Sequence, residues 1–376
     1  MSYFYRRGLT IAAICTAMLW MSTLALAEDI HIGQTAGFTG VQPGTIKELT
    51  DGAKLWINAV NAKGGVNGHK IILDSLDDGF DPKRAAENAA KLIDAGVLAL
   101  FLSRGTPHSE AIIPLAEKAG IALIAPSTGA LIMHAPLKRT VFNVRSKYQT
   151  EAERAVKHLA TVSMNRIGVV HVDDSFGMDG LAGAERGLKE ANIKPLWILK
   201  YDRSKPDLKP IIDTIAKADV QSVIVIGSGS QAADIIRGAR AAGSTTAFIT
   251  LSNNSSSSFV KLLGDNARGV MVTQVFPNPR RTTHAVLLEF QNLARDAGVD
   301  PSYTSLEGFV SAKVLVEGLR RASAKGPITR AKIIDAMNGL KNFDIGGLQL
   351  SYSAGDHTGL EYIEISIINA KGNFLQ

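Results

Sequence analysis

The chain has 376 residues, a formal net charge of +6 and a single cysteine, Cys15. Positive and negative charges are mixed along its length, without the basic block that nucleic-acid binding requires. We therefore expect no nucleic-acid partner.

The first 27 residues have the form of a secretory signal peptide. Arg6 and Arg7 precede an apolar run over residues 9–26, and the run ends in the small-residue site Ala25-Leu26-Ala27. A membrane anchor is the alternative, because about 20 apolar residues span a bilayer. The acidic Glu28 directly after the site favours cleavage, so we predict a periplasmic protein exported with a cleaved signal peptide.

Cys15 lies inside this segment and is followed by Thr16, which does not fit lipoprotein acylation. The predicted mature chain then has no disulfide, no thiolate nucleophile and no cysteine-based zinc site. Its 349 residues are enough for two domains with ordinary cores, and loss of Arg6 and Arg7 lowers the net charge to +4. No later stretch is apolar for long enough to cross a membrane, so we expect no membrane insertion of the mature chain.

Apolar β-rich runs alternate with amphipathic helices through the first half of the mature chain. The pattern predicts strands at 29–36, 70–76, 97–102, 121–125 and 141–144. It predicts helices at 45–62, from Asp81-Pro82 onward and at 110–119, and Asp81 has the residue type of an N-cap before a proline at the first helical position. The strands are apolar on both faces, as buried parallel strands are.

The alternation then restarts and is followed by a helical block. We expect strands at 167–172, 196–201, 222–226, 247–250 and 269–275, and helices at 177–191, 208–217 and 231–242. Three helices at 283–297, 304–323 and 328–338 precede two short strands at 348–351 and 362–368. Two successive β-α series predict an α/β protein with two doubly wound parallel-sheet lobes.

Six motifs in order resemble those of the periplasmic leucine/isoleucine/valine-binding proteins. They lie at residues 36–40, 57–68, 77–82, 105–107, 124–129 and 173–177. The resemblance implies a type I periplasmic binding protein fold with three hinge crossings. It implies lobe 1 at 28–147 plus 277–352 and lobe 2 at 148–276 plus 353–376. It also implies a solute receptor, expected to be a monomer, that serves an inner-membrane ABC permease and binds an amino acid or a related carboxylate.

Candidate ligand-binding residues follow the carboxyl ends of predicted strands, where open α/β sheets bind ligands. Thr106, Ser127 and Thr128 are candidates for an anionic group, because hydroxyls and free N–H groups at a helix N-terminus suit a carboxylate. Each of the three has the alternative role of a turn or capping residue. Phe38 and Thr39 belong to the loop that resembles the family's first pocket loop.

Further candidates lie at the predicted crossing and in the second lobe. Phe176 takes the place of an aromatic residue that packs on the ligand in the family, and core packing is its alternative role. Tyr148 lies where the chain is expected to cross between lobes. Arg145 suits a bidentate pair with a carboxylate, or equally an interlobe or surface salt bridge. Ser230 belongs to a glycine-rich loop expected on the cleft side of lobe 2.

One position departs from the family pattern. In amino-acid-binding members an acid in the second lobe holds the ligand's α-ammonium group, and Ser252 and Asn253 stand there in this chain. Since an uncompensated buried ammonium is costly, either another acid such as Asp174 replaces the missing one or the ligand is not an α-amino acid. The family's usual disulfide is also absent, because Phe80 stands where one cysteine is expected.

Two other functions remain as alternatives. Residues 227–232 match the dinucleotide fingerprint G-x-G-x-x-A, but in the second unit and without a following acid for a ribose, which argues against an oxidoreductase. Hydrolase motifs are absent, and the histidines, His108 included, are not spaced as metal ligands. We therefore expect no enzyme, no cofactor and no metal. A periplasmic sensor for a signalling partner is the second alternative to a transport receptor.

Overall fold

The computed structural model describes residues 28–324 and 326–375. One sheet has five parallel strands in the order β2-β1-β3-β4-β5, which is the doubly wound order with a reversal between β1 and β3. Its strands are β1 (Ile30–Ala36), β2 (Ile71–Asp77), β3 (Ala99–Phe101), β4 (Ala122–Ile124) and β5 (Val141–Phe142).

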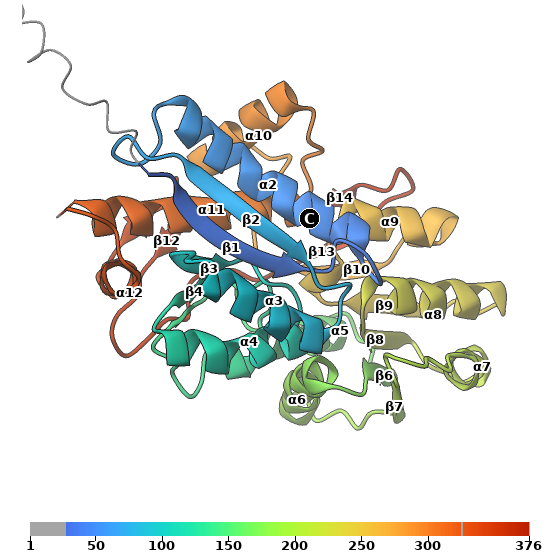
Figure 1. Cartoon of the computed structure of the whole chain (residues 1–376). Helices are drawn as coiled ribbons and strands as arrows, with labels where there is room; N and C mark the ends of the chain where they lie inside the picture. Colours follow the sequence, from blue (N-terminus) through green and yellow to red (C-terminus); the bar gives the residue numbers. More distant parts are fainter. Residues whose placement is uncertain (1–27, 325, 376) are drawn as a thin grey trace, which may run out of the picture.

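Helices cover both faces of this sheet (Figure 1). One apolar core joins the sheet to α2 (Pro43–Ala62), α10 (Ala285–Ala297), α11 (Tyr303–Ser323) and α12 (Arg330–Asn338). A smaller core on the other face joins it to α3 (Pro82–Asp94) and α4 (Thr106–Ala119). We call the sheet with these helices lobe 1. As expected, the Asp81 side chain caps α3, accepting from the Arg84 N–H at 2.8 Å.

The second sheet has seven strands in the order β14-β13-β10-β9-β8-β6-β7, and we call it with its helices lobe 2. Its parallel strands are β6 (Ile167–Val172), β7 (Trp197–Tyr201), β8 (Ser222–Ile226), β9 (Ala247–Thr250) and β10 (Met271–Gln274). Two antiparallel strands extend it, β13 (Glu364–Ile368) and β14 (Phe374–Leu375). Every residue of β6 and β8 is buried, because helices lie on both faces. These helices are α5 (Tyr148–Thr161), α6 (Ser175–Glu190), α7 (Lys209–Lys217), α8 (Gly229–Ala241) and α9 (Ser257–Leu263).

The chain passes between the two sheets three times: after β5, after β10, and between the small hairpin of β11 (Phe343–Asp344) with β12 (Gln349–Leu350) and β13. The two-lobed α/β fold predicted from the alternating pattern is therefore confirmed. The exact lobe boundaries remain a prediction.

The structure differs from the sequence prediction at three places. The helix α5 was not predicted, although Ala152, Ala155, Val156 and Leu159 have helical spacing and are fully buried. Likewise α9 was not predicted. The segment predicted as a strand at 348–351 pairs only with β11, so it joins neither large sheet.

Candidate functional site

A cavity lies where the carboxyl ends of both sheets meet. It is small, about 20 Å³, which is room for about one water molecule. Its walls include the loops after β1, β3, β6 and β8, the strands that flank the reversal of strand order in each sheet. The segments after β2, β5, β7 and β9 complete them. The lining residues are Gln42, Phe80, Arg104, Gly105, Thr106, Pro107, Tyr148, Phe176, Arg203, Ser228 and Asn253.

The N-terminus of α4 forms part of the lobe 1 wall. Gly105 precedes the helix with a φ of 97°, a conformation that residues with a side chain rarely adopt. Thr106 begins the helix, and its hydroxyl lies 2.7 Å from that of Thr128. The helix dipole and the free N–H groups of its first turn favour an anionic group at this wall.

Arg104 places a buried positive charge beside this helix. The residue is 3% exposed, and its guanidinium donates to the Ser127 hydroxyl at 2.7 Å and to the main-chain carbonyl of Asn253 in lobe 2 at 2.9 Å. The Ser127 hydroxyl in turn donates to Glu307 at 2.6 Å. Among the described residues Arg104 makes no ion pair of its own.

Aromatic rings form the apolar walls. Tyr148 and Phe176 pack edge to face with their centroids 4.9 Å apart. Phe80 also lines the cavity and packs on the His108 ring, with the two centroids 4.4 Å apart. Burial lowers the pKa of His108 to about 4, so this ring is neutral at pH 7. His108 is buried and is not among the residues that line the cavity.

Phe80 is held in a left-handed conformation, with a φ of 61°. The Asp78 carboxyl fixes the turn by accepting from the Phe80 N–H at 2.9 Å and from the Thr35 hydroxyl at 3.1 Å. Burial raises the pKa of Asp78 to about 6. Strained backbone of this kind is common where a side chain must be held in place for a ligand.

A second cation, Arg203, forms the lobe 2 wall with Ser228. Its guanidinium pairs with Asp174 at 2.6 Å, donates to the Ser228 hydroxyl and lies 5.6 Å from the Phe80 ring centroid. Asp174 also caps α6 by accepting from the N–H groups of Phe176 and Gly177. Asp174 is therefore already occupied by a cation and a helix cap, and it is not among the lining residues.

Arg145 lies behind the cavity in a group of buried charges that we call the Arg145 cluster. Its guanidinium is 3.0 Å from Glu151 and 3.6 Å from Glu307, and it donates to the Ser252 hydroxyl. Glu151 also accepts from the Ser252 N–H at 2.9 Å and from the Thr273 hydroxyl at 2.5 Å. Burial alone would lower the pKa of Arg145, but Tyr148 and the two carboxylates together raise it. The cluster joins residues of both lobes. Arg145 therefore makes salt bridges between the lobes, which was one of the alternatives considered for it.

Of the ten residues proposed from the sequence, Thr106, Tyr148 and Phe176 line the cavity. Ser127 and Thr128 touch lining residues through hydrogen bonds, while Arg145 and Ser252 belong to the Arg145 cluster.

The remaining three lie farther out. The exposed Thr39 donates from its N–H and hydroxyl to Asp77, and Phe38 next to it is half-buried. Ser230 borders an apolar groove of about 370 Å³ between α2, α8 and α9. In the glycine-rich loop it is Ser228 that lines the cavity.

Sequence reasoning did not single out Gln42, Phe80, Arg104 or Arg203 as site residues. Arg104 directly precedes the Gly105-Thr106-Pro107 motif, and Phe80 lies inside the 77–82 motif, so both adjoin recognised segments. Arg203 follows β7, and its role depends on contacts with Asp174 and Ser228, 29 and 25 residues away.

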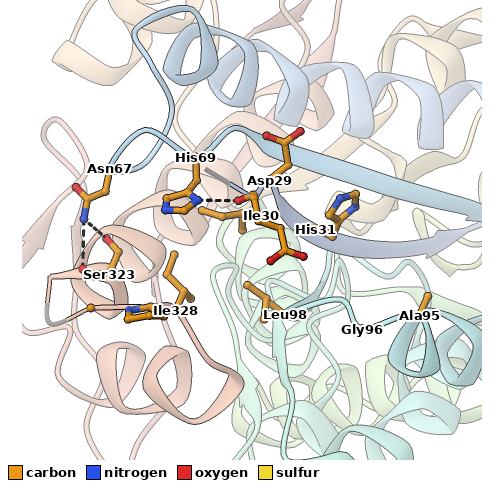
Figure 2. Close-up of a pocket in the computed structure, with 13 residues that line it drawn as sticks. Asp29, Ile30, His31, Asn67, His69, Ala95, Gly96, Leu98, Ser323 and Ile328 are labelled. Atoms are coloured by element: carbon orange, nitrogen blue, oxygen red, sulfur yellow. Dashed lines mark hydrogen bonds between the residues drawn. The ribbon is translucent and has the colours of Figure 1, made fainter. Parts of the chain in front are cut away.

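A larger cavity, of about 650 Å³, lies at the opposite end of lobe 1 (Figure 2). It is lined by Ile30 at the start of β1 and by Leu98 just before β3, so it is at the amino ends of the strands. Asn67 donates to Ser323, and the His69 ring lies 2.6 Å from the Glu28 carbonyl oxygen. This location is outside the reversal points that bind ligands in doubly wound sheets.

No helix among residues 28–324 and 326–375 is long and apolar enough to cross a bilayer. The predicted signal peptide lies outside the described residues. The same ranges contain no group of three acidic, histidine or cysteine side chains arranged to hold a metal ion.

Two α/β lobes with residues of both around one cavity define a solute-binding class of protein, and comparisons with known proteins agree. A family model described as periplasmic binding protein matches residues 29–373. The chain is 27% identical over 270 residues to the Leu/Ile/Val-binding protein of Escherichia coli strain K12, covering 71% of this chain and 73% of the relative.

Solved structures show the same likeness. A substrate-binding periplasmic protein from Ralstonia solanacearum is 30% identical, with a TM-score of 0.86 over 93% of this chain and 100% of its own. A branched-chain amino acid transporter protein from Thermus thermophilus with bound valine shares the fold at 17% identity and a TM-score of 0.83, over 94% and 96% of the two chains.

The chain belongs to the periplasmic binding protein family. The likeness to leucine/isoleucine/valine-binding proteins, first indicated by six short motifs, is confirmed.

Proposed function

We propose that the chain is the solute receptor of an ABC importer and that its lobes close on a small amino acid-like or carboxylate ligand without transforming it. The observation that carries the proposal is the cavity at the reversal points of both sheets, walled by Thr106 of lobe 1 and Phe176 and Ser228 of lobe 2. The names of the relatives support it, since those proteins are described as binding leucine, isoleucine and valine.

The three chain crossings suit a hinge between the lobes. Because a cavity of about 20 Å³ is too small for an amino acid, the lobes must separate to admit one. A ligand that touches both lobes binds more tightly when the lobes are together than when they are apart. This difference in affinity stabilises the closed arrangement. The closed form then docks on the inner-membrane permease. We propose for the lobes the bounds expected from the sequence, with crossings near residues 147, 276 and 352.

A thermal-shift screen of the exported chain tests the proposal. The compounds are amino acids, small carboxylates, aromatic acids and amides. At a hundredfold excess over its Kd, a ligand stabilises the folded state by about 2.7 kcal/mol, which raises the melting temperature by roughly 5 °C. Thr106→Ala should reduce the shift, and Thr282→Ala, which removes an exposed hydroxyl, should leave it unchanged. If no compound raises the melting temperature, the receptor function is rejected.

Export is tested separately, by the mass of the protein recovered from the periplasm. We propose removal of residues 1–27, so the chain should begin at Glu28. A mass that includes the first 27 residues would show an uncleaved anchor instead.

A further inference from the structure

We propose that the site selects a carboxylate anion with a flat apolar body and no ammonium group, with Arg104 as its counter-charge. The proposal rests on the receptor function above and names its ligand class. It also assigns a neutral donor on the ligand, such as a hydroxyl, to the amide oxygens of Asn253 and Gln42.

The charge of the cavity wall is the first argument. Arg104 and Arg203 line the cavity, and no acidic side chain does. Arg203 is neutralised by Asp174, whereas Arg104 is 3% exposed and makes no ion pair among the described residues. A buried cation without a counter-ion is costly, so the wall favours an anion and repels an ammonium group.

Glu307 does not supply the missing counter-charge. Its Oε1 is 3.6 Å from the Arg145 guanidinium and accepts a hydrogen bond from the Ser127 hydroxyl. That hydroxyl accepts from Arg104 and so lies between Glu307 and the Arg104 guanidinium. Glu151 is likewise bonded to Arg145, Ser252 and Thr273. Both acids of the Arg145 cluster are thus engaged away from the cavity, and neither is available to hold a ligand's ammonium.

The hydrogen bonds of Arg104 show how a carboxylate would be accepted. In lobe 2 the guanidinium donates to the main-chain carbonyl of Asn253, a neutral acceptor. A carboxylate is a stronger acceptor for a guanidinium than a neutral oxygen. As the lobes separate, a ligand carboxylate can therefore replace that carbonyl. The N-terminus of α4 at Thr106 lies beside it and also favours negative charge.

Two buried acceptors indicate that the ligand also carries a hydrogen-bond donor. Asn253 Oδ1 and Gln42 Oε1 have no hydrogen-bond partner, and both residues line the cavity with at most 9% exposure. The Asn253 amide nitrogen donates to Gly227 and Asn254 oxygens, which fixes its oxygen as the free atom. These atoms call for a donor, and beside Arg104 a neutral hydroxyl satisfies them without charge repulsion. The rings of Phe80, Tyr148 and Phe176 suit a flat apolar body.

Titration calorimetry with matched compounds tests the ligand class. Tyrosine and 3-(4-hydroxyphenyl)propanoate differ only by the α-ammonium group, as do leucine and 4-methylpentanoate. We expect each deaminated acid to bind at least about 10-fold more tightly than its amino acid, and the hydroxyphenyl acid to bind best, because a like charge near Arg104 costs affinity.

Variants test the role of Arg104 itself. Arg104→Gln should weaken binding of 3-(4-hydroxyphenyl)propanoate by about 30-fold or more and abolish its preference over the corresponding amide. Arg139→Gln is the matched control, since Arg139 is exposed and is not among the lining residues. Asn253→Asp adds the acid that the site lacks, and it should shift the affinity ratio of each pair toward the amino acid. Since each variant is judged by a ratio between two compounds, a general loss of folded protein does not imitate the result.

The outcomes separate the ligand class from the receptor function. If tyrosine or leucine binds as tightly as its deaminated partner, or if Arg104→Gln keeps the preference for the acid over the amide, the ligand class is overturned and the receptor function stands. If neither the acids nor the amino acids bind, both are rejected.

Discussion

Two of the regions where the lobes meet differ in chemistry. In the Arg145 cluster, Arg145, Glu151 and Glu307 are each at most 4% exposed and bond to one another and to buried hydroxyls. Elsewhere, Glu48 of α2 accepts from the N–H groups of Ser257 and Ser258 at the start of α9, at 3.0 and 2.8 Å, and we call this the Glu48 contact (Figure 1).

The difference suggests different roles for the two regions. Charges in the Arg145 cluster have no access to water, so separating them leaves ions buried without partners. Glu48 is half-buried and its partners are neutral, so water can replace them when the lobes part. The Glu48 contact is thus suited to break and re-form during ligand entry, while the Arg145 cluster suits a fixed pivot.

The largest effect is expected from Glu151→Gln. The change leaves Arg145 with one weaker ion partner in a fully buried site, and it should lower the free energy of unfolding by about 3 kcal/mol or more. Urea denaturation measures the loss. Glu185→Gln, at an exposed position of α6, is the control and should change stability by less than about 0.5 kcal/mol. An equal effect of the two variants would remove the basis for a fixed pivot.

A pH effect should follow from His134, which lies close to the Arg145 cluster. Burial, with Lys147 and Arg145, lowers the pKa of His134 to about 3 from an ordinary value of 6.5. Because the unfolded state takes up the proton first, the stabilisation is complete above pH 6.5 and is lost as the pH falls below it. At pH 5 the loss is about 2 kcal/mol.

Urea denaturation of wild type and His134→Gln at pH 7 and pH 5 measures this contribution. The variant should lose about 2 kcal/mol less than wild type between the two pH values. Identical losses would show that His134 does not titrate as a buried group.

A smaller effect on stability is expected from Glu48→Gln. The variant keeps an acceptor but loses the charge that strengthens four hydrogen bonds, to two N–H groups and to the hydroxyls of Ser258 and Ser302. The arrangement with the lobes together should lose about 1 kcal/mol. Small-angle X-ray scattering should then show a larger radius of gyration for Glu48→Gln than for wild type. The control Glu185→Gln should have the same radius of gyration as wild type. A radius equal to that of wild type would rule out a gating role for Glu48.

The smallest effect is expected at the surface pair of Arg166 and Asp219. Their side chains are 49% and 88% exposed, and the ions are 3.0 Å apart. Asp219→Asn should change the free energy of unfolding by less than about 0.5 kcal/mol, and added salt should reduce even this difference. A loss comparable to that of Glu151→Gln would mean that burial does not set the strength of ion pairs in this protein.

Much of the fold was predictable because its causes are local. The strands β6 and β8 are continuous apolar runs, and Asp81-Pro82 begins α3 with an N-cap that the structure confirms. The helix α5 was missed although its buried residues have helical spacing, because charged residues separate them and no proline or glycine marks its start. Thr106, Tyr148 and Phe176 were identified by their position after strands or at a crossing, and that position brings them to the cavity.

The sequence by itself determined the alternation of strands and helices, and with it two doubly wound lobes and the strand ends that form the candidate site. Only the tertiary structure decided the charge of the site. Arg104 donates a hydrogen bond to Asn253, 149 residues away. Glu307, on the distant helix α11, contacts both Arg145 and Ser127. Local patterns set secondary structure, whereas the electrostatics of a buried site depend on which charges the fold brings together and which it leaves without a partner.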